Sequence, residues 1–442
     1  MKKSKGVFRI PYQNGTVVKI SGDHKTHKPK GRIDMSGILG SQPYRIVAAA
    51  DGHIRFIVDK FSKQVDSSSG DPCTNNYVWI EHAHGEWTKY SHLRKNSVTK
   101  MAKLKVGQFV KAGTFLGFEG KVGCASGSHL HFEVGVPKAT NPITTTGGFL
   151  KDNADSKRNR IPRICGIPNQ VFVKGESYTA KNVPGNIAPG FKEVARHGLP
   201  AKNYQCLFDQ AVNSNYELKW IDVFDHKGEV FFNVIFRPQG KAKWAAFHGL
   251  TAAAYQKKFT KFTDKGYRPI QVESYRSGNE VRYAVIFKKN AGPKFTAYHG
   301  FSGSKHQKRF DELTKKGWAP RNISVVSIAG SRKYTALYEK TNVGSFVAKS
   351  SMTPAEYQKQ FDKNLEASRQ VAYLNAHDHN GAPFLTAIWN SKTKGTFIAR
   401  HNLSSSKYQK EWEKATSDGF LTRYVTGYRS GSSVKYAAVW RK

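Results

Sequence analysis

The second half of the chain repeats itself at a fixed interval of 51 residues. Glutamine recurs at this interval, and an aromatic residue follows it three positions later: Gln205, Gln256, Gln307, Gln358 and Gln409, with Phe208, Phe259, Phe310, Phe361 and Trp412. Five copies without one inserted residue indicate that one small structural unit is built five times. The fold of this half must therefore be an array of five equivalent units.

The pattern within one copy predicts its elements. Thr251 can cap a helix of about a dozen residues whose apolar positions 255, 259 and 262 share one face, and Gly266 can end it. Strands are expected at 269–275 and 281–288 around a turn, with a third at 294–299. Each unit is then an α-β-β-β repeat, with starts near 199, 250, 301, 352 and 403.

The ends of the array predict how the units are arranged. The last copy stops after its second strand, whereas residues 193–198 resemble the strand that leads into each later helix. We therefore expect a closed, propeller-like ring that the N-terminal strand completes, because closure removes exposed sheet edges. An open solenoid with two uncapped ends is the alternative.

Histidine recurs at one position of the repeat, with serine in the fourth copy: His197, His248, His299, Ser350 and His401. We interpret this histidine as a residue of the strand-to-helix turn, since repeat positions are usually selected by the fold they share. A ring of ligand-binding histidines is the alternative.

The first third of the chain holds residues that indicate chemistry. His129, His131 and Glu133 alternate, so on a β-strand their side chains would point to the same face. Imidazole and carboxylate groups are zinc ligands, but a zinc site needs further ligands from elsewhere in the chain. Upstream segments offer them: His24, His27, Asp34 and His92.

These motifs, in this order, resemble the lysostaphin/LytM-type zinc metallopeptidases of family M23. The resemblance extends over roughly residues 16–148 and includes the segments 47–52, 75–82, 90–93 and 104–120. It implies an antiparallel β-sheet peptidase domain at 1–148, so that the chain is mainly β with α+β repeats. Residues 149–190 have little periodicity and are expected to be a linker, and 191–442 the five-repeat ring domain.

The resemblance also implies roles for individual residues. Asp34 and His131 would bind Zn²⁺ with a histidine upstream of Asp34, but the family spacing falls on Lys30 here. His27 is preferred as the third ligand because it needs the shorter inserted loop, and His24 is the alternative.

Two further histidines, His92 and His129, correspond to the family's non-ligand histidines. They would act as general base and as donor to the tetrahedral oxyanion. The sequence does not say which of the two has which role.

Four cysteines permit three pairings. We expect Cys73–Cys124 and Cys165–Cys206, because this choice keeps each link local. Disulfides predict an oxidising compartment, and four buried thiols are the alternative.

The charge of the chain predicts a polyanionic partner. Lysine and arginine number 71 against 32 acidic residues, a formal charge of +39 that is spread along the chain. No apolar run is long enough to span a membrane, and residues 6–14 are too polar for the apolar core of a signal peptide. We expect the mature form of a secreted protein, from which the signal peptide has been removed.

Together these features predict a secreted, monomeric zinc endopeptidase that hydrolyses peptide bonds of bacterial peptidoglycan, with basic repeats that bind the cell wall. The alternative is a non-catalytic or autoinhibited binding protein for an anionic polymer, either a wall polymer or a nucleic acid. Nucleic acid is the less favoured partner, because the sequence has no zinc-finger or basic-zipper motif.

Overall fold

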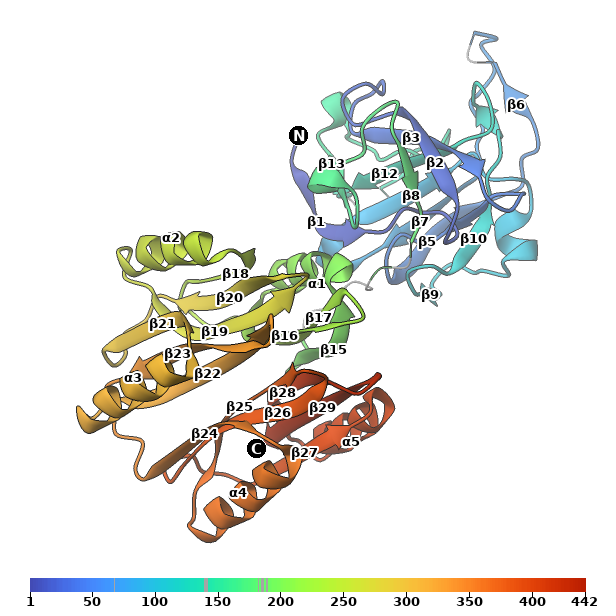
Figure 1. The fold of residues 1–442 in the computed structure, drawn as a ribbon. Coiled ribbons are helices and arrows are strands. Elements are labelled where there is room, and N and C mark those ends of the chain that lie inside the picture. The colour runs from blue at the N-terminus through green and yellow to red at the C-terminus, as the bar shows by residue number, and fades with distance from the viewer. Residues whose placement is uncertain (67, 139–141, 182, 184–186, 188–189) are drawn as a thin grey trace. The chain divides into compact units, whose positions relative to one another are not determined.

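A computed structural model describes residues 1–66, 68–138, 142–181, 183, 187 and 190–442. The chain divides into two compact units, which we call unit 1 (Met1–Pro189 and Gln205–Asn215) and unit 2 (Gly190–Tyr204 and Tyr216–Lys442). Both consist mainly of β-strands (Figure 1). Among the described residues, no helix has both the length and the apolar character that crossing a membrane requires.

Unit 1 is built around a large sheet. Its strands are β1 (Lys3–Phe8), β2 (Val17–Gly22), β3 (Arg32–Leu39), β4 (Arg45–Val47), β5 (Gly52–Val58), β6 (Gln64–Val65), β7 (Tyr77–Glu81), β8 (Trp87–Ser91), β9 (Phe109–Val110), β10 (Phe115–Phe118), β11 (Gly123–Cys124), β12 (Leu130–Gly135), β13 (Asn159–Ile164) and β14 (Ser177–Thr179). The ten-stranded sheet has the order β14-β2-β3-β12-β8-β7-β5-β9, and β13 pairs with both β1 and β12. Two small sheets, β10-β4 and β11-β6, accompany it.

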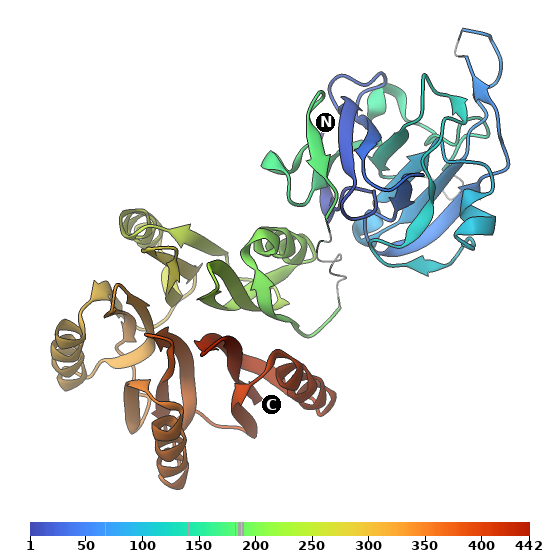
Figure 2. The same cartoon turned by 45° about the vertical axis from the view of Figure 1, so that its right-hand side comes forward.

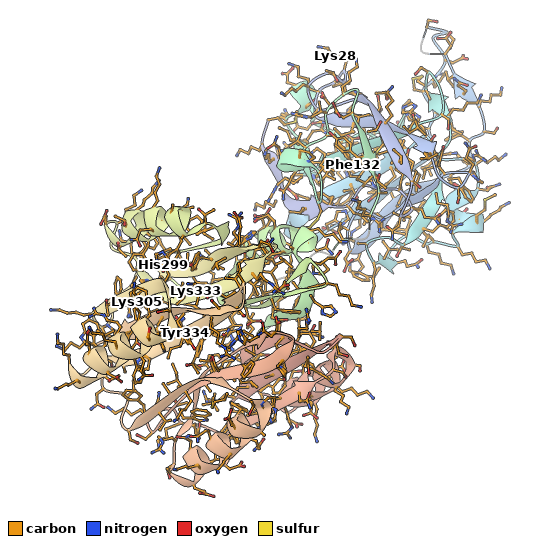
Figure 3. All side chains as sticks on the ribbon, viewed as in Figure 1. Lys28, Phe132, His299, Lys305, Lys333 and Tyr334 are labelled. Atoms are coloured by element: carbon orange, nitrogen blue, oxygen red, sulfur yellow. A yellow bond between two sulfur atoms is a disulfide. The ribbon has the colours of Figure 1, made fainter. Side chains whose placement is uncertain are left out.

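The central strands of this sheet have one apolar and one polar face. Ile33 on β3, Tyr90 on β8 and Phe132 on β12 are buried in the same core, and Figure 3 labels Phe132 within unit 1. Because successive side chains of a strand point to opposite faces, their neighbours Asp34 and His131 lie on the other face. The fold thus places the polar residues that the sequence singled out on one side of a well-packed sheet.

The segment at 149–190 differs from the linker that we expected. Strand β13 pairs with β1 and β12, and β14 pairs with β2, so these parts of the segment are folded onto unit 1. Polar and apolar residues do not alternate in β13, which reads Asn-Arg-Ile-Pro-Arg-Ile, so periodicity does not identify it as a strand. Residues 182, 184–186 and 188–189 of the expected linker lie outside the described residues.

Both expected disulfides are present. Cys73 is bonded to Cys124 and Cys165 to Cys206, with Cα–Cα distances of 5.1 and 5.6 Å. Both links lie within unit 1, since residues 205–215 belong to it. The structure therefore confirms the local pairing.

The helices of the five repeats are α1 (Ala201–Asn213), α2 (Ala252–Thr263), α3 (Gly303–Lys315), α4 (Pro354–Glu366) and α5 (Ser405–Ser417). Residues 205–213 of α1 belong to unit 1, whereas the other four helices and all strands of the repeats lie in unit 2. Its strands are β15 (Val194–Pro200), β16 (Tyr216–His226), β17 (Glu229–Pro238), β18 (Trp244–Leu250), β19 (Arg268–Ser277), β20 (Glu280–Lys288), β21 (Phe295–Phe301), β22 (Ala319–Ile328), β23 (Ser331–Glu339), β24 (Phe346–Met352), β25 (Gln370–His379), β26 (Ala382–Asn390), β27 (Phe397–Leu403), β28 (Leu421–Ser430) and β29 (Ser433–Arg441). In Figure 2, α2 to α5 lie on the outside of unit 2 and the hairpin strands lie toward its middle.

The elements within a repeat agree with the sequence pattern. The Thr251 side chain accepts a hydrogen bond from the backbone N–H of Ala254, as a helix cap does. Tyr255, Phe259 and Phe262 pack in one apolar cluster with the sheet of the same repeat. The predicted helix face and the three predicted strands are therefore confirmed.

The grouping of these elements corrects our expectation. Each repeat forms its own three-stranded sheet, and the first strand of that sheet precedes the helix: β15-β17-β16, β18-β20-β19, β21-β23-β22, β24-β26-β25 and β27-β29-β28. The repeat is therefore β-α-β-β and not α-β-β-β. The fifth sheet has all three strands, and β15 completes the first sheet, so the expected sealing of the last repeat by the N-terminal strand is wrong. The five sheets do not close into one continuous sheet.

Neighbouring repeats are joined by side chains that hydrogen-bond to a neighbouring strand. The Gln271 amide donates to the Ile221 carbonyl (2.6 Å), and the Asn322 amide donates to that of Val272 (2.8 Å). The first and fifth repeats are also in contact, since the Trp220 indole donates to the Val425 carbonyl (2.7 Å). These contacts between repeats are hydrogen bonds from side chains to backbone carbonyls, whereas the strands of each repeat pair within their own sheet.

The recurring histidines pack against aromatic rings of an adjacent repeat. The pairs, with their ring-centroid distances, are His197 with Tyr408 (4.3 Å), His248 with Tyr204 (4.6 Å), His299 with Tyr255 (5.0 Å) and His401 with Tyr357 (5.3 Å). The next residue has a left-handed backbone at a β-bulge in every repeat: Gly198, Gly249, Gly300, Ser351 and Asn402. This packing supports a structural role for the histidines rather than a ligand-binding one.

Candidate active site

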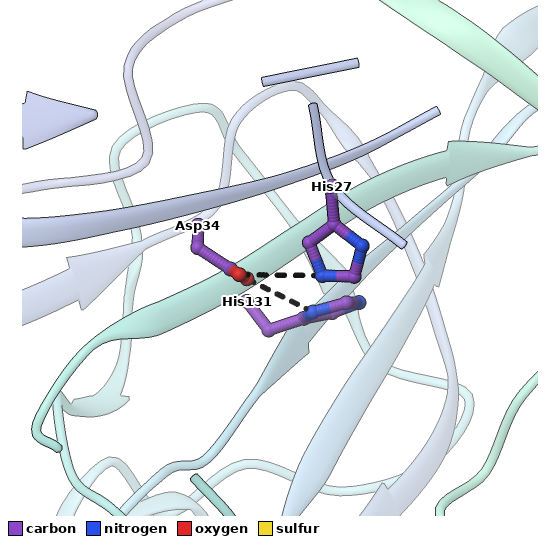
Figure 4. A group of neighbouring side chains, drawn as sticks. All are labelled: His27, Asp34 and His131. Carbon is purple, nitrogen blue, oxygen red and sulfur yellow. Dashed lines mark hydrogen bonds and ion pairs between the residues drawn. The ribbon is translucent and has the colours of Figure 1, made fainter. Parts of the chain in front are cut away.

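Asp34 and His131 face each other across two paired strands. They are directly opposite in the register of β3 and β12, and the Asp34 Oδ1 atom lies 3.1 Å from His131 Nδ1. His27 approaches the same carboxylate from a loop, with its Nε2 atom 3.2 Å from Asp34 Oδ2 (Figure 4). One ligand atom of each of these three side chains lies within 4.8 Å of the others.

The loop between β2 and β3 positions His27. Asp23 holds the loop: its carboxylate accepts the backbone N–H groups of Lys25 and Thr26, both at 2.9 Å. The Asp23 carbonyl accepts the N–H of His27 at 2.9 Å. Four hydrogen bonds to Asp23, from Lys25, Thr26 and Lys174, lower the pKa of its carboxyl to about 2 although burial opposes this, so Asp23 stays an acceptor at neutral pH.

The alternative histidine, His24, does not reach this group. Its backbone carbonyl accepts the N–H of Gly31 at 2.9 Å, at the other end of the same loop. The three side chains that meet are therefore those of His27, Asp34 and His131.

His92 and His129 lie beside these three residues. The two rings are 4.6 Å apart, and His92 lies 5.9 Å from the ring of His131. His129 Nε2 lies 3.7 Å from Asp34 Oδ1. His92 has a left-handed backbone (φ 66°), which is uncommon for a non-glycine residue and often occurs at functional sites. His27, Asp34, His92, His129 and His131 therefore share one site.

Backbone carbonyls orient three of the imidazole rings. The Nδ1 atoms of His27, His92 and His129 lie 2.8–2.9 Å from the carbonyls of Pro29, Val122 and Gly127, respectively. Because a carbonyl oxygen only accepts, each Nδ1 carries a proton, and in the neutral rings of His92 and His129 the Nε2 atom is left with a lone pair. The Nε2 atom of His27 instead faces the Asp34 carboxylate. His131 has the opposite orientation, since its Nδ1 faces Asp34.

Burial and charge keep the site in a defined protonation state. Burial lowers the pKa of His92 to about 3, and the neighbouring His129 and His131 contribute to this shift. Burial would raise the pKa of Asp34, but the hydrogen bonds with His131 and His27 outweigh it and hold the pKa well below its usual range. At neutral pH, His92 is therefore neutral and Asp34 is a carboxylate.

A buried group of charges lies behind His131. Glu133 Oε1 lies 3.9 Å from His131 Nε2 and 3.8 Å from Lys89 Nζ, and its Oε2 accepts from Arg32 and Asn159. Burial raises the pKa of Glu133, but the charges of Lys89 and Arg32 outweigh it, so the net shift is downward. The sequence pattern predicted that Glu133 lies on the same face as His131. It did not single out Lys89 and Arg32, although both are charged residues within buried strands.

A cavity of about 470 Å³ opens over these residues. The five site residues line it, together with Phe149 and the disulfide between Cys73 and Cys124. Phe149 lies in the segment that we expected to be a linker, and no pattern in the sequence connects it with the site. The cavity is large enough to admit several residues of a peptide.

The family comparisons agree with this geometry. Residues 30–143 match peptidase family M23. Residues 192–239, 241–290, 292–341, 343–392 and 394–442 match the polyglycine hydrolase-like structural repeat. The repeat matches together cover more than half of the chain.

Curated relatives match the peptidase part. The chain is 34% identical over 132 residues to a protein of Buchnera aphidicola described as an uncharacterized metalloprotease, which covers 29% of this chain and 30% of that protein. It is 39% identical over 69 residues to the peptidoglycan DD-endopeptidase ShyC of Vibrio cholerae, a match that covers 16% of this chain and 14% of ShyC. The chain thus spans less than a third of the length of these relatives.

Solved structures that resemble the chain include the catalytic domain of the antimicrobial peptidase lysostaphin from Staphylococcus simulans, at 22% identity and a TM-score of 0.19. That match covers 31% of this chain and 88% of the lysostaphin domain. The catalytic domain of the prophage-encoded M23 protein EnpA from Enterococcus faecalis matches at 20% identity and a TM-score of 0.21. That match covers 27% of this chain and 82% of the EnpA domain. By the matches that span more than half of its length, the chain belongs to the family with the polyglycine hydrolase-like structural repeat, and its residues 30–143 match peptidase family M23.

Proposed function

We propose that this protein is a zinc metalloendopeptidase that hydrolyses peptide bonds of bacterial peptidoglycan. The observation that carries the proposal is the meeting of His27, Asp34 and His131 beside two further histidines within an M23 domain. The relatives described as peptidoglycan DD-endopeptidases support this substrate class.

The residues of the site fit zinc. Two imidazoles and one carboxylate leave a coordination position for water or substrate, which is typical of catalytic zinc sites. His131 Nε2 and Glu133 Oε1 are buried without a hydrogen-bond partner among the described residues, and they lie 3.9 Å apart. A metal on His131 Nδ1 would fix the proton on Nε2, facing that carboxylate, as metal-binding histidines usually arrange it.

Zinc in this position supplies Lewis-acid chemistry, since it polarises a carbonyl group and lowers the pKa of water. The protein supplies proton transfer. His92 and His129 each keep an unprotonated Nε2, so either imidazole can accept a proton from a water molecule. With that proton the same ring becomes a donor and can stabilise the oxyanion of the tetrahedral intermediate.

Digestion of purified peptidoglycan from several wall types tests this proposal. We expect new amino and carboxyl termini at defined peptide bonds, identified by mass spectrometry, and no cleavage by an Asp34→Ala variant or after chelation. Binding to peptidoglycan without any new termini would instead favour the non-catalytic alternative.

We also propose that the protein is secreted and that its repeats hold it on the anionic cell wall. Two disulfides are typical of an oxidising compartment. Basic side chains such as Lys28 and Lys305 are exposed, and Figure 3 labels both. The excess of positive charge would attract a wall rich in phosphate or carboxylate groups.

Finally, we propose that the five repeats of unit 2 form a closed circular array, held by side-chain contacts and not by an exchanged strand. The support is the junction between the first and fifth repeats. His197 packs on Tyr408 as His248 packs on Tyr204, and the Thr426 hydroxyl donates to Asp222 at 2.7 Å.

Removal of the fifth repeat, residues 394–442, tests the closed array. A closed array loses two junctions, so the remaining four repeats should unfold at a clearly lower temperature. An open array loses only one junction at its end, and because its stability is a sum of local terms, its melting temperature would change little.

A further inference from the structure

A second cavity, of about 600 Å³, lies in unit 2, and we call it the repeat cavity. Its walls come from all five repeats. Two consecutive repeat positions contribute a lining residue in every copy: Lys219, Ile270, Arg321, Ala372 and Arg423 at the first, and Trp220, Gln271, Asn322, Tyr373 and Tyr424 at the second. The cavity therefore belongs to the array as a whole and to no single repeat.

Positive charge dominates its lining. Six basic side chains line it against one acidic residue, Glu339: Lys219, Arg237, Arg268, Lys288, Arg321 and Arg423. Most surface lysines of the protein point into solvent, where water screens their charge. Here six cations line one cavity.

Three carboxylates neutralise only part of this charge. Glu339 pairs with Arg268 and Arg321, Glu217 pairs with Lys219 and Lys288, and Glu193 pairs with Arg237. Arg423 has no ion pair or hydrogen bond within the part of the chain that the structure describes. The cavity thus has more cations than the protein's own acidic residues can pair.

The unpaired charge acts on its neighbours. Burial lowers the pKa of Arg237, and the nearby Arg423 lowers it further. Burial also lowers the pKa of Lys219; the ion pair with Glu217 opposes this shift, and repulsion from Lys288 adds to it. A negatively charged ligand would relieve this repulsion, so the cavity is electrostatically complementary to an anion.

Aromatic rings contribute to the same wall. The ring of Trp220 lies 5.7 Å from Tyr373 and 5.0 Å from Tyr424. Apolar ring surface beside the cations lowers the local polarity and strengthens the interaction between arginine and an oxyanion. They also offer contact area for the uncharged part of a ligand.

We propose that the repeat cavity binds phosphate groups of an anionic wall polymer, that is, a phosphodiester chain of polyol units. Four of the six cations are arginines, whose planar guanidinium groups match phosphate oxygens in two parallel hydrogen bonds. The volume exceeds that of one phosphate group and admits consecutive groups of a chain. This inference deepens the proposed wall-binding role of the repeats and rests on that role for the identity of the polymer.

Titration calorimetry on the full chain tests the site, with inorganic tripolyphosphate as the probe. We expect one binding event per chain. Arg423→Glu should weaken it about tenfold or more, because it replaces a charge-assisted contact with repulsion. The matched control is Lys257→Glu, which makes the same charge change on the exposed face of α2 and should leave affinity within about twofold.

Equal weakening by the two variants, or no binding of tripolyphosphate to the wild-type chain, would overturn the proposal. Poly(glycerol phosphate) and a single-stranded oligonucleotide of equal charge then compete with the probe. Displacement by the polyol polymer at lower concentration supports a wall polymer, and preferential displacement by the oligonucleotide contradicts it. Peptide hydrolysis is measured in parallel and should be unchanged in both variants, so failure of the cavity and failure of the peptidase are distinguishable.

Discussion

Two kinds of backbone constraint bring the three proposed ligands to the site. Asp34 and His131 are fixed by strand register, whereas His27 depends on the hydrogen bonds of its loop to Asp23. We predict that His27→Ala loses bound zinc and activity, because one of three ligands is removed. His24→Ala should retain both. Metal analysis of the two purified variants checks this, and equal zinc content would show that His27 is not a ligand.

The two other histidines of the site should separate metal binding from catalysis. His92→Ala and His129→Ala should keep zinc, because neither belongs to the group of His27, Asp34 and His131. Their rate constants for peptide hydrolysis should fall about 100-fold or more, since proton transfer and oxyanion stabilisation each contribute at least that much. A variant that keeps zinc and the wild-type rate would exclude that residue from the mechanism.

The sequence indicated the residues of the site better than their surroundings. The alternation of His129 and His131 and the family resemblance were enough to place Asp34, His92 and His131 together. The choice between His27 and His24 could not be made from spacing with certainty, because it depends on how Asp23 folds the loop. Phe149 could not be predicted at all, since its contact with the site arises from tertiary packing.

Among the elements, periodicity predicted the helices and strands of the repeat but not which of them share a sheet. The same residues fit an α-β-β-β or a β-α-β-β unit, because a repeating sequence has no intrinsic starting point. The structure decides: β15 pairs with β17, so the first strand belongs with the hairpin that follows it. For a similar reason β13 and β14 were missed, since their pairing partners lie far away in the sequence.

The second strand of each β-α-β-β repeat brings one polar residue to a common buried region of unit 2: Asp222, Glu273, Ser324, Asn375 and Thr426. The Asn375 amide donates to Asp222 at 3.4 Å and to Glu273 at 3.1 Å. Burial raises the pKa of both carboxyl groups, that of Asp222 to about 7, and the charge of Asp222 adds to the shift of Glu273. The folded state therefore holds a proton here that the unfolded chain releases near pH 4.

These shifts predict a loss of stability in alkali. A carboxyl group whose pKa is higher in the folded than in the unfolded state stabilises the folded protein. This contribution is complete below about pH 4 and is lost as the pH rises through the pKa of the folded state. Buried histidines act in the opposite sense only near and below about pH 6.5, so the loss is measured above about pH 7, where the carboxyl pair of Asp222 and Glu273 gives up its protons. We expect the unfolding free energy of unit 2 to fall there by up to about 1.4 kcal/mol per pH unit.

The matched variant is Glu273→Gln. It keeps the oxygen that accepts from Ser324 and Asn375, and its amide replaces Oε2, which has no partner among the described residues. Calorimetric melting curves at several pH values should become flatter in this variant, while the exposed control Glu366→Gln should follow the wild type. Identical slopes in all three proteins would show that Glu273 ionises normally.

For the whole molecule, the charge of +39 and the two units together predict how salt affects activity. Contacts between exposed basic residues and an anionic wall weaken as the Debye length falls from about 10 Å at 0.1 M salt to about 3 Å at 1 M. The site in unit 1 is a cavity over buried residues, where screening has less effect. Sedimentation with whole sacculi, measured with an inactive Asp34→Ala chain, should therefore decrease strongly over this range. Hydrolysis of a short soluble peptide by the wild-type chain should change little. Retention on sacculi at 1 M salt would mean that apolar or hydrogen-bonded contacts, and not charge, hold the protein on the wall.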